Sequence, residues 1–550
     1  MSRGRLLWAC AALAALVAAG AYVGPSQSAA RPLDQATLEK LTGEDWYAIS
    51  LGGQNTGYGV IRSTLEQTPA GQPQLVVSQQ LEIKLRVLAL EVSGSTLLTV
   101  WHDQSLTPLR YHLDLDQLGQ KYVVEAVREG NLLRAQKTVA GNTTSKVVNL
   151  VDDFGSDSEL SLRALRGELK PGDTFQFAAF DPWFMDLDEQ QVSVGQWATL
   201  KLNDKPVRAL EIETHSQAWD VTSTAWLSEA GQVLRMELPT LMNMVMTKVT
   251  EEEALAKLAP LQISASIPVA VRLPEAGQVS RLTLRASSSG APIRDLIPAS
   301  PRQKVTVERD QMAAAVAIAA EKTPNGKLTI PVREPAVGAF VAPTEFIQSS
   351  DPALVAKAKE IVGSETNAWR AAQKIREWVY RNMTKRDSYP KPITARECLE
   401  VMEGDCSEHA MLFVGLARAA SIPAQFVAGV VYSRGAFWYH AWVEVYVAPN
   451  TWVAVDPTWN QAIADATHIS LAEGVMDSAS FARVCLAAAR TMGALKLEIR
   501  EYRTTDGKVH KVEAGAHAAD AAVEPLWSAK SPDFALRNIG PSPAVVADAP

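Results

Sequence analysis

The sequence predicts an α+β protein, in which a large antiparallel β-rich N-terminal region, a sandwich or an open barrel, precedes a core of packed helices and strands. From about Asp45 to Lys248, apolar and polar residues alternate with a period of two between Gly-, Asn-, Asp- and Pro-rich turns, as in antiparallel sheets with one buried face. After about residue 350 the apolar residues recur with a helical period, in DPALVAKAKEIVG and NAWRAAQKIREWVYRNM. Because 550 residues exceed what one hydrophobic core usually serves, we expect several domains.

The chain begins with a segment that is typical of exported proteins. Two arginines among the first five residues precede an apolar run over residues 6–24, and the small residues Ser28 and Ala30 follow. These are the parts of a secretory signal peptide, and the run is also long enough for a membrane anchor. We therefore expect residues 1–30 to direct the protein to the periplasm or the extracellular space, either as a cleaved signal or as an anchor that associates with the membrane.

Changes in composition divide the rest of the chain into four parts. Residues 31–258 are predicted to form the β-rich domain, and 259–345 a small β module or structured linker, because short strand-like pieces alternate there with Pro, Ser and Gly. Helices and strands are mixed in 346–500, the predicted core domain. A C-terminal extension at 501–550 is rich in Ala, Pro, Ser and Asp, and we expect it to be partly disordered.

The composition argues against a nucleic-acid partner. Hydrophobic residues make up 47% and charged residues 21% of the chain, which is ordinary globular usage, and the formal net charge is -8. No block of Lys or Arg follows the N-terminus, so a surface that tracks phosphates is not expected. His102, His112 and His215 are scattered over the β-rich region without metal-ligand spacing and are interpreted as structural.

Three cysteines, Cys398, Cys406 and Cys485, follow the leader, which contains Cys10. In an exported protein disulfides form readily, so an odd number leaves one thiol free or paired with another molecule. A disulfide between Cys398 and Cys485 would leave Cys406 free. It is one of the arrangements that the sequence leaves open.

Cys406 lies in GDCSEHAMLF, where an apolar helical run begins. Asp405 is a suitable N-cap for a helix over 406–420, which would place Cys406 in the first turn. There the positive end of the helix dipole favours a thiolate, the nucleophilic form of cysteine. A single cysteine in this position is better explained as a small buried residue, so the assignment depends on the stretch that follows.

That stretch, FWYHAWVEVYVAPNTWVAVDPTWN, predicts a β-hairpin. If the valines of both strands share the buried face, His440 and Asp456 share the opposite face. A three-residue loop satisfies this condition, with Val447 opposite Thr451 and Trp442 opposite Asp456. His440 then lies diagonally across from Asp456, roughly 7 Å away at Cα and within reach of a hydrogen bond between imidazole and carboxylate.

The sequence thus places a thiol at a helix N-terminus and an imidazole and a carboxylate on neighbouring strands. This is the set of groups that a thiol nucleophile needs. Cys406 would attack a carbonyl carbon, His440 would take its proton and later donate one to the leaving group, and Asp456 would hold the imidazole in the required tautomer.

The motifs G-D-C-S-E-H-A, YHAWVEVYV and WVAVDPTWNQ occur in the order and spacing of the transglutaminase-like superfamily, which the chain resembles over about residues 345–475. The resemblance implies a papain-like, transglutaminase-like fold for the core domain. It also implies that Cys406, His440 and Asp456 correspond to the nucleophile, the general base and the orienting acid of the family.

Two kinds of metal site are considered for this region. His409, one turn after Cys406, raises a zinc site made of Cys406, His409 and His440, but no CxxC or HExxH spacing supports it. No calcium loop of the type DxDxDG occurs, so we expect neither a metal nor a cofactor requirement.

The oxyanion donors are the backbone N–H of Cys406 and, as a further candidate, the side chain of Trp378 or Tyr380, each of which is more simply read as a core aromatic residue. Glu444 shares the predicted face of His440 and could line the cleft, although an exposed strand carboxylate is the default reading.

Together these residues predict an exported cysteine enzyme that acts on amide bonds of a protein or peptide substrate through a thioester. An amine acceptor would give crosslinking, and water would give hydrolysis. The competing class is a non-catalytic binding module, in which the β-rich region holds a partner and the core serves as a scaffold.

Overall fold

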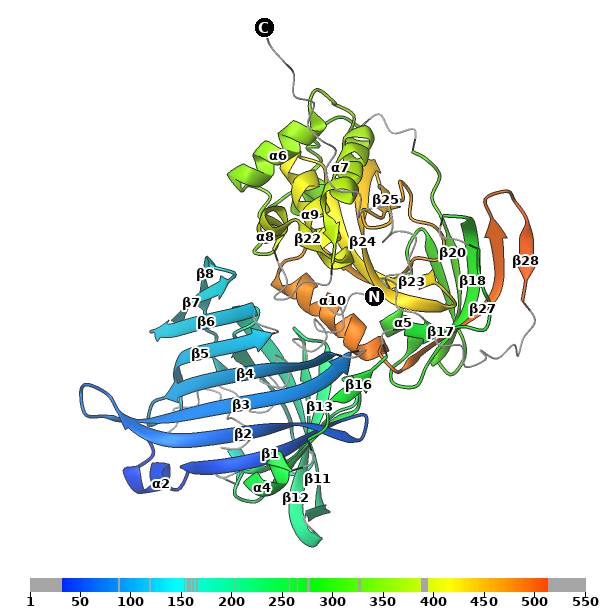
Figure 1. The fold of residues 1–550 in the computed structure, drawn as a ribbon. Helices are drawn as coiled ribbons and strands as arrows, with labels where there is room; N and C mark the ends of the chain where they lie inside the picture. The colour runs from blue at the N-terminus through cyan, green and yellow to red at the C-terminus, as the bar shows by residue number, and fades with distance from the viewer. Residues whose placement is uncertain are drawn as a thin grey trace.

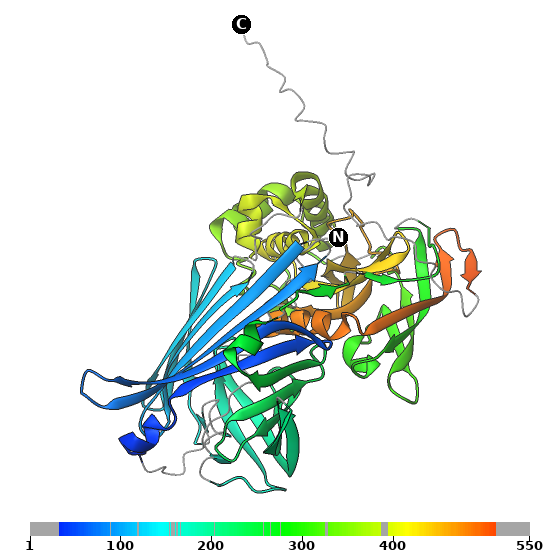
Figure 2. The ribbon, with the colours of Figure 1, turned by 60° about the horizontal axis from the view of Figure 1, so that its bottom comes forward.

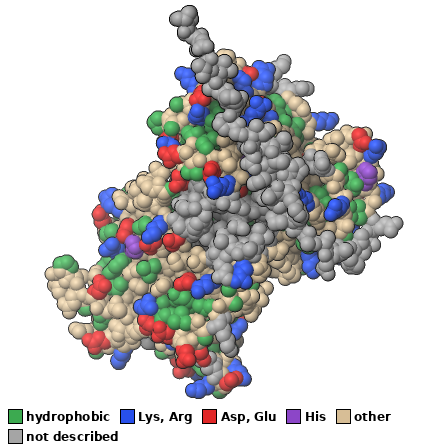
Figure 3. Space-filling model, viewed as in Figure 1, with side chains coloured by type: hydrophobic (Ala, Val, Ile, Leu, Met, Phe, Trp, Pro, Cys, Tyr) green, Lys and Arg blue, Asp and Glu red, His purple; other side chains and the backbone are tan. Residues whose placement is uncertain are grey.

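The computed structural model describes residues 32–512, apart from short gaps at 88–89, 118–119, 153, 156–159, 161–162, 165–166, 203, 257, 265, 275–276, 325–327 and 387–393. The predicted leader at 1–30 and the tail from 513 lie outside the described residues. No helix within the described part of the chain is long and apolar enough to cross a membrane. On the face drawn in Figure 3, acidic and basic side chains are interspersed over the described surface.

The N-terminal half forms one large sheet in the order β8-β7-β6-β5-β4-β3-β2-β1-β15-β14-β13-β12-β11-β10-β9, with β16 paired to β3. Within β1–β8 and within β10–β15, successive strands pair antiparallel, and β1 pairs with β15 to join the two halves. Strand β9 pairs in parallel with β10, and β16 pairs in parallel with β3. The predicted antiparallel β-rich region is therefore confirmed. The strands are β1 Gly43–Leu51, β2 Gln54–Gln67, β3 Pro73–Val87, β4 Leu90–His102, β5 Pro108–Gln117, β6 Gln120–Glu129, β7 Leu132–Val139, β8 Asn142–Asn149, β9 Phe154–Gly155, β10 Thr174–Asp181, β11 Asp186–Leu202, β12 Lys205–Ser216, β13 Val221–Leu227, β14 Val233–Leu238, β15 Met244–Val249 and β16 Leu261–Ile263.

This sheet curls around its own core, as Figure 1 shows. Strands β5 and β10 are far apart in the strand order, yet the ring of Tyr111 on β5 lies 5.0 Å from that of Phe180 on β10. One face of each strand is apolar, and curling buries these faces against each other. Two short helices accompany the sheet: α2 Gln35–Glu39 and α4 Glu251–Leu255.

The three histidines of this region have ordinary partners. His102 is buried with Nδ1 3.3 Å from the Leu75 carbonyl, His112 Nδ1 lies 2.5 Å from Glu125, and His215 Nδ1 lies 3.1 Å from the Thr222 hydroxyl. These contacts account for the histidines as structural residues.

A second sheet, in the order β19-β20-β18-β27-β28, combines strands from two distant parts of the chain. Strand β18 pairs with β27 from Val279/Thr504 to Ser288/Leu495. The boundary predicted at 345 therefore separates β18 from its partner β27, and the boundary predicted at 500 falls inside β27. The elements are β18 Val279–Ser288, α5 Ile293–Leu296, β19 Gln303–Val307, β20 Ala313–Ala319, β27 Leu495–Thr504 and β28 Val509–Lys511.

The core domain is built on a third sheet, β17-β24-β23-β26 with β25 beside β24, against which the helix α9 packs. Helix α9, Cys406–Ala419, confirms the predicted helix. Its residues from Cys406 to Arg418 are all buried, so α9 is enclosed on every side rather than along one stripe. The other elements are β17 Ser266–Pro268, η1 Pro335–Phe340, α6 Pro352–Val362, α7 Ala368–Asn382, β21 Thr384–Lys385, α8 Ala395–Val401, β22 Glu403–Gly404, β23 Ala424–Ser433, β24 Ala436–Ala448, β25 Thr451–Val455, β26 Ile469–Gly474 and α10 Ser478–Thr491.

Helix α10 lies between the curled sheet and the core sheet, as Figures 1 and 2 both show. The indole N–H of Trp183 donates to the Ser478 carbonyl at 3.2 Å, and the Trp183 ring lies 5.6 Å from that of Phe481. The buried Lys137 ammonium donates to the Trp183 carbonyl at 3.0 Å and pairs with Glu345 at 3.3 Å. The β-rich domain therefore supports one helix of the core directly.

The close packing of α8 on α9 predicts how a substitution at Gly415 affects stability. Replacing a mid-helix glycine by alanine normally stabilises a protein by about 1 kcal/mol. At Gly415, however, an added Cβ would lie 2.6 Å from the Cβ of Ala395, and overpacking of this kind costs about 1–3 kcal/mol. We expect Gly415→Ala to lower the Tm, and Ala395→Gly to offset part of that loss in a double-mutant cycle. Strictly additive effects of the two substitutions would contradict the predicted contact.

Candidate active site

The hairpin of β24 and β25 has the predicted register over most of its length. Val443 pairs with Val455 and Tyr446 with Trp452, as period-two burial of the valines requires. The register shifts by one residue next to the turn, where Ala448 rather than Val447 lies opposite Thr451. This irregularity is confined to the loop end, because the buried valines fix the pairing farther along the strands.

His440 and Asp456 meet as the register predicts. The His440 Nε2 lies 2.6 Å from Asp456 Oδ2, and both side chains are almost completely buried. Asp456 stands just beyond β25, where it forms a bridge with Gln461 that closes a tight loop. The hydrogen bond between the two side chains is thus held by the hairpin on one side and by this loop on the other.

Cys406 is the first residue of α9, and its position is fixed by the cap. Asp405 accepts the backbone N–H of Ser407 at 2.8 Å, and Glu408 accepts that of Asp405 at 2.6 Å, which completes a capping box. A Cβ at Gly404 would lie 2.4 Å from that of Glu408, so only glycine fits before the cap. The sequence G-D-C is therefore explained by the geometry of the helix start.

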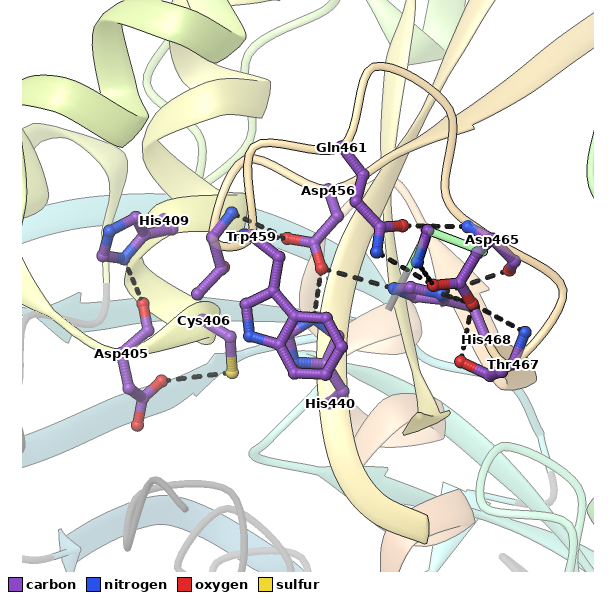
Figure 4. A network of polar contacts seen from close by, with 12 residues as sticks. Asp405, Cys406, His409, His440, Asp456, Trp459, Gln461, Asp465, Thr467 and His468 are labelled. Atoms are coloured by element: carbon purple, nitrogen blue, oxygen red, sulfur yellow. Dashed lines mark hydrogen bonds and ion pairs between the residues drawn. The ribbon is translucent and has the colours of Figure 1, made fainter. Parts of the chain in front are cut away.

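The Cys406 thiol is fully buried, and Figure 4 shows it directed toward the Asp405 carboxylate. Its Sγ donates to Asp405 Oδ1 at 3.4 Å and lies 3.9 Å from the Ser407 hydroxyl. Because Ser407 and His440 line the same small cavity, the start of α9 and strand β24 meet at one site. Of the three predicted residues, His440 and Asp456 are in direct contact, and Cys406 begins the helix that packs on the strand of His440.

Both carboxylate oxygens of Asp456 accept hydrogen bonds. Its Oδ1 accepts the backbone N–H groups of Thr458 at 2.7 Å and Trp459 at 3.0 Å, and its Oδ2 faces His440 and His468. Burial alone would raise the pKa of Asp456, but the charges and hydrogen bonds of the two histidines outweigh burial and hold the pKa well below its usual range. Asp456 is therefore ionised at neutral pH.

His468 is a functional candidate that the sequence reasoning missed. Its Nε2 lies 3.3 Å from Asp456 Oδ2 and its Nδ1 3.3 Å from Asp465 Oδ1, and it has no solvent exposure. Burial would lower the pKa of His468, but Asp465 and Asp456 more than offset this and raise the pKa to about 8. The sequence around His468, DATHISLAE, contains no motif that links this residue to Asp456. Only the three-dimensional structure identifies the contact.

The hydrogen bonds define the protonation of the cluster. An ionised carboxylate only accepts, so His440 donates to Asp456 from Nε2–H. His468 faces a carboxylate with each ring nitrogen, which fits an imidazolium. Figure 4 shows the resulting chain from Asp465 through His468 and Asp456 to His440. Nδ1 of His440 is therefore the atom that would take the proton of a nucleophile.

Two tryptophans flank the imidazole. The ring of Trp459 stacks on His440 with centroids 4.9 Å apart, as Figure 4 shows, and the ring of Trp442 lies 6.1 Å away on the same strand as His440. These rings replace water around His440 and limit its rotation, which keeps the ring oriented toward Asp456.

The zinc alternative finds no support among the described residues. The Nδ1–H of His409 donates to the Asp405 carbonyl at 2.5 Å, and burial lowers the pKa of His409 to about 4. His440, Asp456 and His468 are near enough to share a metal, with ligand atoms within 4.8 Å of one another, but their hydrogen bonds and charges are already complementary.

The expectation of an exposed carboxylate at Glu444 is wrong. Glu444 is buried, accepts the amide of Gln425 at 2.8 Å, and has a pKa that burial raises to about 7. Trp378 and Tyr380 are half-buried and lie against Lys357 and Lys385, respectively, and Trp378 also packs against the hydrophobic core. The sequence alone could not predict whether these side chains are buried or exposed, because the pattern of the strand or helix around each of them is the same for a buried and for an exposed position.

All three cysteines of the described chain are buried and none of them is in a disulfide, so Cys398 and Cys485 are not joined. Burial, together with the carboxylates of Glu408 and Glu397, raises the pKa of Cys398 well above its usual range. Cys398 is therefore an unreactive thiol in the same chain, useful as an internal reference for Cys406.

A thiol, an imidazole and a carboxylate on a helix start and an antiparallel hairpin define a papain-like type of core. Residues 355–457 match the model of the transglutaminase-like superfamily. All three candidate residues fall within the matched range.

Comparisons with individual proteins are less extensive. An uncharacterised protein from Haemophilus influenzae is 31% identical over 144 residues, which cover 21% of this chain and 36% of that relative, so the chain spans about a third of its length. A solved structure described as a candidate cysteine protease from Cytophaga hutchinsonii is 18% identical, covering 46% of this chain and 90% of that one with a TM-score of 0.29. A β-barrel-like protein of unknown function from Brucella abortus is 11% identical, covering 38% and 95% of the two chains with a TM-score of 0.28.

The raised pKa of His468 predicts a pH-dependent stability. An unfolded histidine has a pKa of about 6.5, so the stabilisation from His468 is fully present below about pH 6.5 and is lost as the pH rises through about 8. The difference corresponds to roughly 2 kcal/mol. We expect the Tm of the wild type to fall between pH 6.5 and 9, and His468→Gln to be less stable at pH 6 and to lack that fall. An equal slope in both proteins would contradict the ion pair.

Proposed function

We propose that this protein is a cysteine enzyme that forms a thioester between Cys406 and an acyl group from an amide bond of a protein or peptide. The observation that carries the proposal is the buried hydrogen bond of 2.6 Å between His440 and Asp456, beside a cysteine at the start of α9. The match of residues 355–457 to the transglutaminase-like superfamily supports this reaction class. The export signal predicted in residues 1–30 supports an exported protein that acts outside the cytosol.

In the first half of the proposed reaction, His440 Nδ1 takes the proton of the Cys406 thiol while Sγ attacks the carbonyl carbon. The negative charge that develops on the carbonyl oxygen is met by the backbone N–H of Cys406, which has no partner within the helix because it belongs to the first turn. Asp456 stabilises the imidazolium that forms on His440. The amine leaves with the proton that His440 returns to it, and the acyl group remains on sulfur.

In the second half, an acceptor attacks the thioester and His440 takes its proton. The sulfur leaves as a thiolate and regains its proton from His440. A primary amine as acceptor gives a new amide bond, and water gives a free acid. The aromatic rings of Trp459 and Trp442 reduce the water around His440, which would extend the time available to an amine.

A non-catalytic binding protein is the second candidate, and one observation favours it. The Cys406 thiol is fully buried and donates to the Asp405 carboxylate, whose negative charge opposes formation of a thiolate. A binding protein would keep Cys406 as a buried structural residue, whereas an enzyme must expose Sγ to its substrate.

Alkylation by iodoacetamide at different pH values separates the two candidates. If His440 activates the thiol, Cys406 should react well below the ordinary thiol pKa of about 8.5, and His440→Ala should remove this low-pH reaction. Cys398 and Cys485, also buried, serve as reference thiols in the same digest and should remain unlabelled. Mass spectrometry of the peptides measures all three sites.

Unchanged labelling of Cys406 in folded His440→Ala would argue for the binding protein. If the thiol is activated, incorporation of a labelled primary amine into a protein or peptide substrate, compared with release of free acid, then identifies the acceptor.

A further inference from the structure

A small cavity lies beside His440, between the start of α9 and the middle of α10. Its free volume is about 40 Å³, whereas a single water needs roughly 10–15 Å³ by the same measure. The cavity therefore has room for about three or four carbon atoms. It is lined by Ser407, Phe426, Ala428, Gly429, Tyr439, His440, Ala441, Leu471, Val484, Ala487 and Ala488.

The lining of this cavity is mostly apolar, and its polar groups gather next to the thiol. The Tyr439 hydroxyl is engaged by Thr491 at 3.1 Å. Ser407 and His440 remain as polar side chains of the wall, and the Ser407 hydroxyl lies 3.9 Å from Cys406 Sγ. A group in the cavity would thus have apolar contacts on most sides and the candidate nucleophile close to one end.

The residues that line the cavity differ in exposure. Phe426 and Leu471 are buried, whereas Ala428, Ala487 and Ala488 are partly exposed, so we take these three as its rim. The small side chains at the rim leave the space open, since a longer side chain at any of them would project into it.

We propose that this cavity binds an aliphatic side chain of the acyl donor, of the size of valine or leucine, next to the carbonyl that Cys406 attacks. This inference rests on the proposed function. The volume fits an isopropyl or isobutyl group, and the apolar wall rewards its transfer from water. A charged or amide side chain would lose its hydrogen bonds to water without finding enough partners in this wall.

The wall that α10 supplies lies outside the segment that matches the superfamily, residues 355–457. Because Trp183 and Lys137 hold the first turn of α10, the β-rich domain helps to position Val484, Ala487 and Ala488. The selectivity of this chain would therefore depend on its own additional elements rather than on the shared core.

A series of p-nitrophenyl esters of N-acetyl glycine, alanine, valine, leucine and phenylalanine tests the proposal on the purified chain. Each rate of nitrophenol release is divided by that ester's rate with free cysteine. We expect leucine or valine to exceed glycine by roughly ten- to a hundredfold, because each methylene in an apolar pocket contributes about tenfold or more.

Two variants should move this preference in opposite directions. Ala488→Leu fills the cavity and should bring the leucine-to-glycine ratio close to one, whereas Val484→Ala enlarges it and should raise phenylalanine relative to leucine. Ala356→Leu, an exposed position on α6, is the matched control and should leave the ratios unchanged.

The outcomes separate this inference from the function on which it rests. Acylation by all esters without a side-chain preference, or a preference that neither cavity variant changes, would overturn the pocket and leave the cysteine enzyme intact. No acylation by any ester, with no activated labelling of Cys406 by iodoacetamide, would overturn both.

Discussion

The candidate site depends on the need to neutralise one buried carboxylate. Asp456 has no solvent exposure, and an ionised carboxylate in such a place is stable only when hydrogen bonds and positive charge replace water. Two backbone N–H groups occupy one oxygen and two imidazoles face the other. The orientation of His440 follows from this arrangement, because the hydrogen that Asp456 requires defines the tautomer of the ring.

The residues of the candidate site lie on separate elements of the fold. Strand β24 carries His440, the loop after β25 carries Asp456, the residue before β26 is His468, and α9 begins at Cys406. Packing α9 on β24 closes the site, and α10 covers the neighbouring surface with support from the β-rich domain. In the proposed enzyme, formation of the Cys406 and His440 ion pair would continue an alternation of charge that His468 and Asp465 already establish. Such an alternation lowers the cost of placing several ionised groups in one core.

The local parts of this site could be predicted from the sequence because local patterns determine them. The valines of the hairpin fix its register, and that register places His440 against Asp456. The cap at Asp405 fixes where α9 starts. The bulge beside Thr451 was not predicted, since it depends on the conformation of a few loop residues.

Contacts between segments that are far apart in the chain leave no local sequence pattern from which they could be predicted. His468 and Asp465 reach Asp456 only through the tertiary fold, and the pairing of β18 with β27 joins strands about two hundred residues apart in the chain. The burial of Glu444 had the same cause, since alternation identifies its strand but not the neighbours that cover its outer face. The sequence therefore predicts the helices, the strands and the hairpin. The buried charged residues around the site can be identified only from the three-dimensional structure.

Intact-protein mass spectrometry after mixing with an activated acyl ester tests the central claim most directly. The account predicts one acyl adduct, located by digestion on Cys406, released by hydroxylamine as a thioester should be, and absent from His440→Ala under the same conditions. A folded wild-type protein that forms no adduct on Cys406, or forms it equally without His440, would contradict the claim that these residues act together as a nucleophile and its base.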